Sequence, residues 1–262
     1  GNKIMWKGEL TPNSNNGIGK FSATGRFEAQ GNIMSLLFGD DFTNQTDLTG
    51  KDYAFYNLFY QNTNIKSAKN LILPATTLAN RCYYEMFKGC TGLTSAPELP
   101  ATTLASGCYN GMFSGTNVLP DCSNIDFTSN SVVSSGGLIG LFDGTKVTDS
   151  DLDRLLPKNT NGKYYLPATT LANSCYDGMF QGCTNLTTAP ELPATTLANY
   201  CYSGMFADCT SLTSAPELPA ETLADYCYYY MFGRCTSLVT APTSTATILA
   251  ESCYSGMFNG CT

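Results

Sequence analysis

Cysteine is the residue type in this chain with the clearest potential for chemistry, because its twelve copies recur at fixed spacing. Eleven of them form two columns, and the second column follows the first by eight residues. The first column consists of Cys82, Cys108, Cys175, Cys201, Cys227 and Cys253, and the second of Cys90, Cys183, Cys209, Cys235 and Cys261. A structural zinc site uses closely paired thiolates of the Cys-x2-Cys kind. The wider spacing therefore predicts no metal site and no cofactor.

Disulfides are an alternative to free thiols in these columns. Five pairs within repeats, together with Cys108 and Cys122, would use all twelve cysteines. Eight residues of intact helix would separate the two Cα atoms by roughly 12 Å, beyond the limit of about 7 Å for a disulfide, although a helix that ends early would shorten this distance. Small buried thiols at repeated positions also suit a stacked core. The pattern favours buried thiols and leaves disulfides open.

The segment Asp149-Ser-Asp-Leu-Asp153 imitates the start of a calcium-binding loop. The pattern then fails, because Arg154 stands where the loop needs glycine and Thr160 stands where it needs a bidentate glutamate. We predict instead a short helix capped by Thr148, with the three aspartates of its first turn placed against the positive end of the helix dipole.

Composition and charge exclude several classes of function. The chain has no histidine, and neither a Gly-rich phosphate loop nor a nucleophile elbow is present in the sequence, so we predict that it is not an enzyme. A net charge of -7 with scattered basic residues argues against nucleic acids and anionic membranes. No run of 18 apolar residues could span a bilayer. Gly1-Asn2-Lys3 lacks an apolar signal core, so we expect an export leader, if the protein is exported, to be absent from this chain.

These residues are positioned by an internal repeat, of which residues 192–217 are one copy. Near-copies begin at Leu73, Leu99, Leu166, Leu218 and, in degenerate form, Ser244, and the regular copies are 26 residues apart. Phenylalanine marks nine units, at Phe38, Phe59, Phe87, Phe113, Phe142, Phe180, Phe206, Phe232 and Phe258. A period of this length predicts a solenoid, in which each unit buries its apolar face against a neighbour. We expect one solenoid domain over residues 31–262, with an insertion within 117–165.

Within one unit, Leu197, Cys201, Met205 and Phe206 share one face of a predicted helix. In sibling units a glycine such as Gly182 would end this helix. The segment 212–219 then predicts a strand of about three residues, interrupted because Pro216 lacks an N–H group. The expected fold class is an α/β solenoid, with parallel strands on the concave side and helices on the convex side. Residues 1–30 lack the repeat and predict a β-hairpin cap.

The recurring series Leu-Pro, Cys-Tyr, Met-Phe, Gly-Cys-Thr and Leu-Thr-Ser-Ala-Pro resembles the BspA-like leucine-rich repeats of bacterial cell-surface proteins. The resemblance covers residues 33–262, and residues 206–212 resemble the core of the family repeat. The units here are longer than the commonest family repeat, and the insertion before Tyr165 departs from the pattern. The resemblance implies a right-handed parallel arc on a host-associated bacterium, with adhesion to host matrix proteins or to other bacteria. It carries over no catalytic residue.

Polar residues beside the predicted strands are the candidate ligand-binding positions on the concave face. They are Thr94, Glu98, Thr187, Glu191, Thr213 and Glu217. The alternative is that they are solvated outer positions of a sheet. A column of tyrosines could also contact a partner or a sugar, but we expect these rings to pack between helices with their hydroxyl groups at the surface. This column comprises Tyr83, Tyr109, Tyr176, Tyr202, Tyr228 and Tyr254.

The sequence thus predicts a secreted or cell-surface binding module without enzymatic activity. Its expected partner is a host matrix protein or bacterial surface protein. The alternatives are a glycan-recognition or uptake component and a structural spacer. The last repeat has a helix but no following strand, and an uncapped edge of this kind favours self-association.

Overall fold

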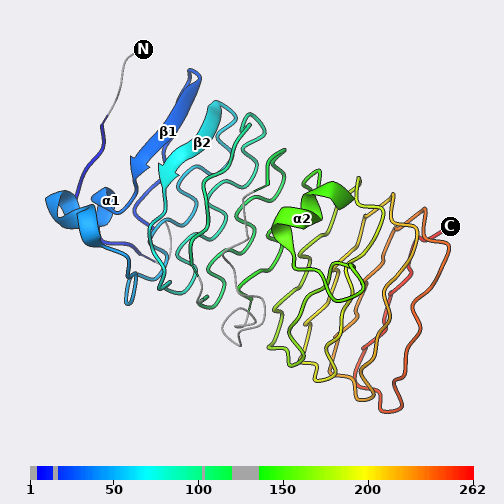
Figure 1. Cartoon of the computed structure of the whole chain (residues 1–262). Helices are drawn as coiled ribbons and strands as arrows, with labels where there is room; N and C mark the ends of the chain where they lie inside the picture. The colour runs from blue at the N-terminus through cyan, green and yellow to red at the C-terminus, as the bar shows by residue number, and fades with distance from the viewer. Residues whose placement is uncertain (1–4, 14–16, 102–103, 120–135) are drawn as a thin grey trace.

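The computed structural model describes residues 5–13, 17–101, 104–119 and 136–262. The chain winds in coils that lie side by side, with the N-terminal segment at one end of the stack and the C-terminus at the other (Figure 1). Backbone hydrogen bonds link residues one repeat apart: the N–H of Phe180 donates to the carbonyl of Met205 (3.0 Å), and that of Phe206 donates to Met231 (2.9 Å). Consecutive repeats therefore stack in parallel and in register.

In the part of the chain that the structure describes, helices and strands of more than one residue are confined to the first 72 residues and to the insertion. Strand β1 (Phe27–Asn32) pairs in parallel with β2 (Ile65–Ile72), with two irregularities of register. The helical segments among the described residues are α1 (Ser35–Phe38), η1 (Gly39–Asn44), η2 (Asp149–Asp151) and α2 (Leu152–Leu155). All four lie outside the regular repeats.

The helix predicted around Leu197 to Phe206 is wrong. This part of each repeat is a series of tight turns, in which alternate N–H groups bond within the coil and the others bond to the next coil. Thus Met205 donates to the carbonyl of Tyr202 (3.2 Å), three residues back, whereas Tyr202 donates to Cys227 of the next coil (3.0 Å). An α-helix would instead bond each N–H to the carbonyl four residues back.

The turns require a positive φ at every fourth residue. In one coil these residues are Tyr200 (φ 59°), Gly204 (56°) and Asp208 (60°). Glycine adopts this conformation without the strain that a Cβ atom introduces, which explains why glycines are common at these positions. Gly182 therefore does not end a helix, as the sequence suggested, but closes a turn with a φ of 67°.

The predicted strands are shorter than expected. Parallel pairing is present, but as single bridges, such as those that join Thr188 to Ser214 and Ser214 to Thr240. A second bridge joins Leu218 to Ser244, beyond the proline. Pro216 and its equivalents cannot donate to a ladder, so each pairing ends after one residue.

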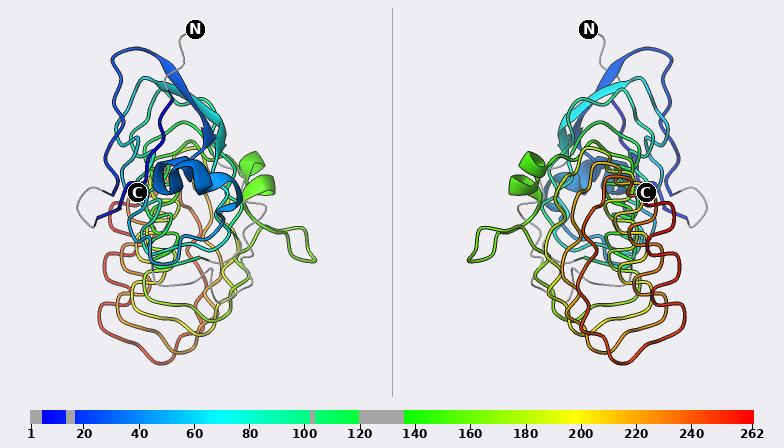
Figure 2. Two further views of the ribbon diagram at one scale, coloured as in Figure 1. Left: turned by 90° about the vertical axis from the view of Figure 1, so that its left-hand side faces the viewer. Right: turned by 90° about the vertical axis from the view of Figure 1, so that its right-hand side faces the viewer.

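The N-terminal β-hairpin is also wrong within the described residues. An antiparallel bridge joins Asn13 to Gly17, but no strand precedes or follows it among the described residues up to Arg26. Phe27 instead begins β1, which continues past residue 30, the predicted end of the cap. This strand pairs with β2. The N-terminal segment and α1 lie across the first coil (Figure 2). The division of the chain at residue 30 remains a prediction.

Aromatic columns fill the core. Phe180, Phe206 and Phe232 are fully buried and nearly parallel, with ring centroids 5.9 and 5.7 Å apart. A second column stacks Tyr176, Tyr202 and Tyr228 at 5.8 and 6.0 Å. Their hydroxyl groups are buried, which corrects the expectation that they reach the surface. The rings point into the coil because the turns place this position inside.

The eleven described cysteines are free thiols, and Cys122 lies outside the described residues. Each thiol of the second column lies close to a phenylalanine carbonyl of the preceding unit: Cys209 Sγ is 3.0 Å from Phe180 O, and Cys235 Sγ is 3.0 Å from Phe206 O. The second-column thiols therefore point toward the preceding coil, whereas Cys108 and Cys175 of the first column lie close to carbonyls of the following coil. Burial raises the pKa of Cys108 to about 12, which leaves this thiol protonated and unreactive at neutral pH.

Candidate functional site

The six polar residues predicted to bind a ligand do not form one site. Thr94 and Thr213 form hydrogen bonds with the preceding coils. Their hydroxyl groups donate to the carbonyls of Lys66 (2.8 Å) and Thr187 (3.2 Å), respectively. These threonines join adjacent coils at the surface. Both side chains are exposed, but their hydroxyl protons are already donated to backbone carbonyls.

Thr187 is engaged by the insertion. Asp149, at the start of η2, accepts hydrogen bonds from the backbone N–H groups of Thr187 (2.9 Å) and Thr188 (3.2 Å) and from the Thr187 hydroxyl. Burial alone would raise the pKa of Asp149, but these hydrogen bonds outweigh it and lower the pKa. The carboxylate therefore fastens the insertion to the strand side of the stack.

The short helix predicted in this segment is confirmed. Thr148 and Asp151 form a capping box, in which the Thr148 N–H donates to Asp151 (3.0 Å) and the Thr148 hydroxyl also contacts that carboxylate (2.6 Å). Asp153 pairs with Lys158 at 2.7 Å. The three aspartates thus have separate partners, and no group of cysteine and acidic residues in the described part of the chain could hold a metal ion.

Glu191 is held by the same insertion. Its carboxylate accepts from the Asn159 side chain (2.6 Å) and pairs with Lys163 (3.0 Å). Glu98 and Glu217 are exposed, and they lie in coils that are not adjacent. Two of the six predicted residues therefore remain open to a ligand, and the fold keeps those two apart.

Replacement of Asp149 by alanine is expected to loosen the insertion and to lower the free energy of unfolding by about 1 kcal/mol, the usual contribution of a partly exposed charged hydrogen-bonding group. Amide hydrogen exchange should accelerate at Thr187 and Thr188. Because the folded-state pKa of Asp149 is lowered, its contribution exists above the usual aspartate pKa of about 4 and disappears as the pH falls through the folded value. Asp153→Ala is the control, with little expected effect on these amides. Unchanged exchange in Asp149→Ala would contradict the fastening role.

A different surface carries exposed aromatic side chains. We call it the outer tyrosine cluster, and it consists of Tyr200, Tyr226, Tyr229 and Tyr230. The rings of Tyr200 and Tyr226 stack with centroids 4.7 Å apart and an interplanar angle of 6°. Tyr229 meets Tyr226 edge-on at 5.9 Å and lies 6.3 Å from Tyr230. Tyr200 and Tyr229 are each 40% exposed.

Polar contacts hold this cluster in place. The Tyr226 hydroxyl donates to Glu251 (2.9 Å), and the Arg234 guanidinium lies 5.8 Å from the centroid of the Tyr230 ring. Arg234 also pairs with Asp208 of the preceding coil at 3.1 Å. The aromatic surface is therefore preorganised by contacts between coils.

Asp177, whose carboxyl group has a shifted pKa, occupies the turn position equivalent to that of Tyr229, two repeats earlier in the chain. Asp177, Ser203 and Tyr229 are spaced by one repeat, so they follow one another along the stack. Burial raises the pKa of Asp177 to about 6, although a hydrogen bond from Ser203 opposes the shift. Asp177 thus lies two repeats before Tyr229 in this series of equivalent positions, and its pKa is above the usual value for aspartate.

Sequence reasoning missed the outer tyrosine cluster because it assigned these residues to a helix. The signal was present in the differences between copies: the position of Tyr230 is Gly204 in one neighbouring coil and Gly256 in the other. A large aromatic side chain at a turn position that usually holds glycine has no role in the repeated core.

No family model matches the chain, and no curated protein matches it. Among solved structures, it is similar to a leucine-rich cell surface protein from Faecalibacterium prausnitzii A2-165, with 17% identity and a TM-score of 0.21. The match covers 78% of this chain and 73% of that chain. Overlap at this TM-score is too slight to transfer a site or a function. Within the described residues, no helix has the length and apolar character needed to cross a bilayer.

Proposed function

We propose that this chain is a non-enzymatic binding module of a secreted or cell-surface protein, built as a right-handed leucine-rich-repeat solenoid of the BspA-like type. The observation that carries the binding role is the outer tyrosine cluster. Four tyrosines from two adjacent coils gather there, and two of them expose much of their rings to solvent. The repeated core needs none of these four side chains.

The cluster has the properties of a protein-recognition surface. Tyrosine is enriched at interaction hot spots because it buries a large ring at little cost in side-chain entropy and offers a hydroxyl group for hydrogen bonding. Contacts with Glu251, Arg234 and Asp208 already fix the rings, so binding would order few additional side chains. The proposed partner is a host matrix protein or a bacterial surface protein.

A glycan, recognised directly or during uptake, is the second candidate. Exposed tyrosine rings provide flat apolar surfaces with polar edges, and Asp177 adds a carboxyl group at the equivalent position two repeats before Tyr229. A structural spacer is the third candidate, and it would have no use for exposed aromatic rings.

The test is binding of the full chain to immobilised matrix proteins and to a glycan array, followed by Tyr200→Ala and Tyr229→Ala together. Loss of two hot-spot side chains should weaken the detected interaction at least thirtyfold, since hot-spot truncations cost about 2 kcal/mol or more. Leu249→Ala is the control, because Leu249 is 64% exposed and lies outside the cluster. If binding is unchanged in the double variant, the outer tyrosine cluster is not the binding surface. If the chain binds neither the matrix proteins nor the glycan array, the structural spacer is favoured.

A further inference from the structure

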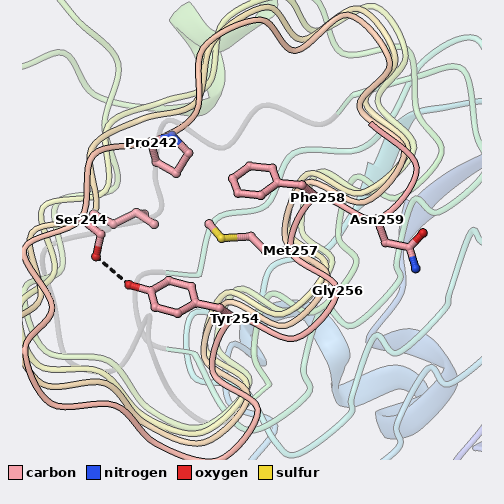
Figure 3. Close-up of a pocket in the computed structure, with 8 residues that line it drawn as sticks. Pro242, Ser244, Tyr254, Gly256, Met257, Phe258 and Asn259 are labelled. Atoms are coloured by element: carbon pink, nitrogen blue, oxygen red, sulfur yellow. Dashed lines mark hydrogen bonds between the residues drawn. The ribbon is translucent and has the colours of Figure 1, made fainter. Parts of the chain in front are cut away.

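The outer tyrosine cluster faces away from the interior of the stack. In the coil that follows it, Tyr254 and Phe258 point into the interior, whereas Asn259 points outward (Figure 3). Two inward residues alternate with two outward residues along each turn segment, and Tyr229 and Tyr230 take the outward positions between two buried pairs. Coils are hydrogen-bonded on both sides of the two that carry the cluster, so its rings lie on the side of the stack.

Partly exposed tyrosines elsewhere in the chain have cations of the same chain against their rings. The Arg81 guanidinium lies 5.6 Å from the centroid of the Tyr53 ring, and the Lys20 amine lies 4.9 Å from that of Tyr60. The insertion contains a third such pair, with the amine 4.6 Å from the ring centroid. A cation in this position is attracted by the electrons of the ring face. The fold therefore repeatedly pairs a tyrosine ring with lysine or arginine.

The outer tyrosine cluster has a cation at one of its four rings. This cation is Arg234, which also pairs with Asp208, so its charge is already balanced within the chain. Among the described residues, no lysine or arginine lies over the rings of Tyr200, Tyr226 or Tyr229. Three rings of the cluster therefore lack the cation that the fold supplies elsewhere.

The coils around the cluster are strongly acidic. Residues 166–262 contain one basic residue, Arg234, and seven acidic residues. Two of the acidic residues lie beside the stacked rings: Glu251 accepts from the Tyr226 hydroxyl (2.9 Å), and the Asp225 carboxylate accepts from the backbone N–H of Glu251 (3.1 Å). Neither carboxylate forms an ion pair within the described residues. Positive charge is therefore missing both over the rings and beside these carboxylates.

We propose that the outer tyrosine cluster binds a basic polypeptide segment of the partner protein. Lysine or arginine side chains of this segment lie over the exposed rings of Tyr200 and Tyr229, and Asp225 and Glu251 balance their charge. Arg234 provides the same combination within the chain, because its guanidinium contacts both a tyrosine ring and a carboxylate. Arginine is preferred, since its planar group stacks on aromatic faces and is weakly hydrated. This inference rests on the proposed function and specifies the chemistry of the partner.

Two synthetic peptides of equal length test the charge requirement with the unaltered chain. One alternates arginine with glycine and the other alternates glutamate with glycine, and each is titrated into the full chain by calorimetry. The arginine peptide is expected to bind. Its affinity should fall by about fivefold or more between about 0.1 M and about 1 M salt, because the screening length shortens from about 10 Å to about 3 Å. The glutamate peptide should not bind.

Substitutions of the two exposed rings separate recognition of a cation from apolar contact. Tyr200→Phe together with Tyr229→Phe keeps both ring faces, and it should change the affinity for the arginine peptide by less than about twofold. Tyr200→Leu together with Tyr229→Leu keeps apolar side chains but removes the ring electrons. This second variant should bind the arginine peptide about tenfold more weakly.

A substitution of one carboxylate tests the charge of the surface. Glu251→Gln removes the charge but keeps an oxygen that can accept from the Tyr226 hydroxyl, and it should weaken binding about threefold. Glu28→Gln is the matched control, because Glu28 is an exposed glutamate of β1, at the other end of the stack, and its loss changes the net charge equally. Little effect is expected from this control.

Three results would overturn the basic partner. The first is equal binding of both peptides, or binding of neither. The second is undiminished binding of the arginine peptide by the leucine variant. The third is binding of a matrix protein or glycan that requires the two rings but does not compete with the arginine peptide. In this third case the binding role of the cluster stands, and only the chemistry assigned to its partner is wrong.

The reverse result is equally distinct. The arginine peptide could bind through the rings while the chain binds neither the matrix proteins nor the glycan array. That outcome would support a basic partner and reject the partners named under the proposed function.

Discussion

Gly182→Ala is expected to lower the free energy of unfolding by about 3 kcal/mol, whereas Gly204→Ala should cost about 1 kcal/mol. Both glycines have positive φ values, of 67° and 56°, so both substitutions strain the backbone by roughly 1 to 2 kcal/mol. They differ in what the new methyl group meets. At Gly182 it would lie 3.2 Å from Cα and N of Gly144 in the preceding coil, and backbone atoms cannot rotate away. Overpacking of this kind adds about 1 to 3 kcal/mol.

Chemical denaturation of the two variants provides the measurement, and Gly204→Ala is the internal control. The nearest atom to a methyl group at Gly204 is the Gln181 side-chain oxygen at 3.8 Å, so this substitution reports the φ strain alone. Equal losses of stability in the two variants would contradict close approach of the backbones at Gly182. If neither variant lost stability, the series of turns itself would be contradicted. Alanine is favourable in a helix, so such a result would fit a helix better than turns with positive φ.

The turns explain why the sequence indicated a helix. Leu197, Cys201 and Met205 are spaced by four residues, which fits one face of an α-helix with 3.6 residues per turn and equally fits a series of four-residue turns. The distinguishing signal was glycine at the same spacing, as in Gly107, Gly111 and Gly115. Repeated glycine is unfavourable inside a helix and favourable where φ is positive.

Features set by local chemistry and by the period were predictable. The repeat indicated parallel stacking of the copies, and Thr148 with Asp151 indicated the capped helix that the structure contains. The phenylalanine column also followed from the period, because a side chain repeated in every coil must meet its own copy. The candidate site was less predictable. Attachment of Asp149 to Thr187 joins residues 38 positions apart, and nothing in the local pattern specifies that contact.

A combined variant with Tyr176→Phe, Tyr202→Phe and Tyr228→Phe is expected to be more stable than the natural chain, by about 3 kcal/mol. These three hydroxyl oxygens are buried and have no hydrogen-bond partner among the described residues. Burial of an unpaired hydroxyl group costs about 1 to 3 kcal/mol, and phenylalanine keeps the stacked ring while removing that group. Desolvation also raises the pKa of Tyr202 well above its ordinary value, so the hydroxyl stays neutral and ionisation offers no compensation.

Tyr254→Phe is the matched control, because its hydroxyl is 2.6 Å from the Ser244 hydroxyl, which lies one repeat beyond Leu218. Loss of this partly exposed hydrogen bond should reduce stability by about 0.5 to 1 kcal/mol, opposite in sign to the inner substitutions. Single variants should be measured beside the triple variant, since stacked neighbours couple and their effects need not add. A lower unfolding temperature in each inner variant would contradict this prediction. It would indicate that the hydroxyl groups form hydrogen bonds with internal water molecules, which stabilise the core.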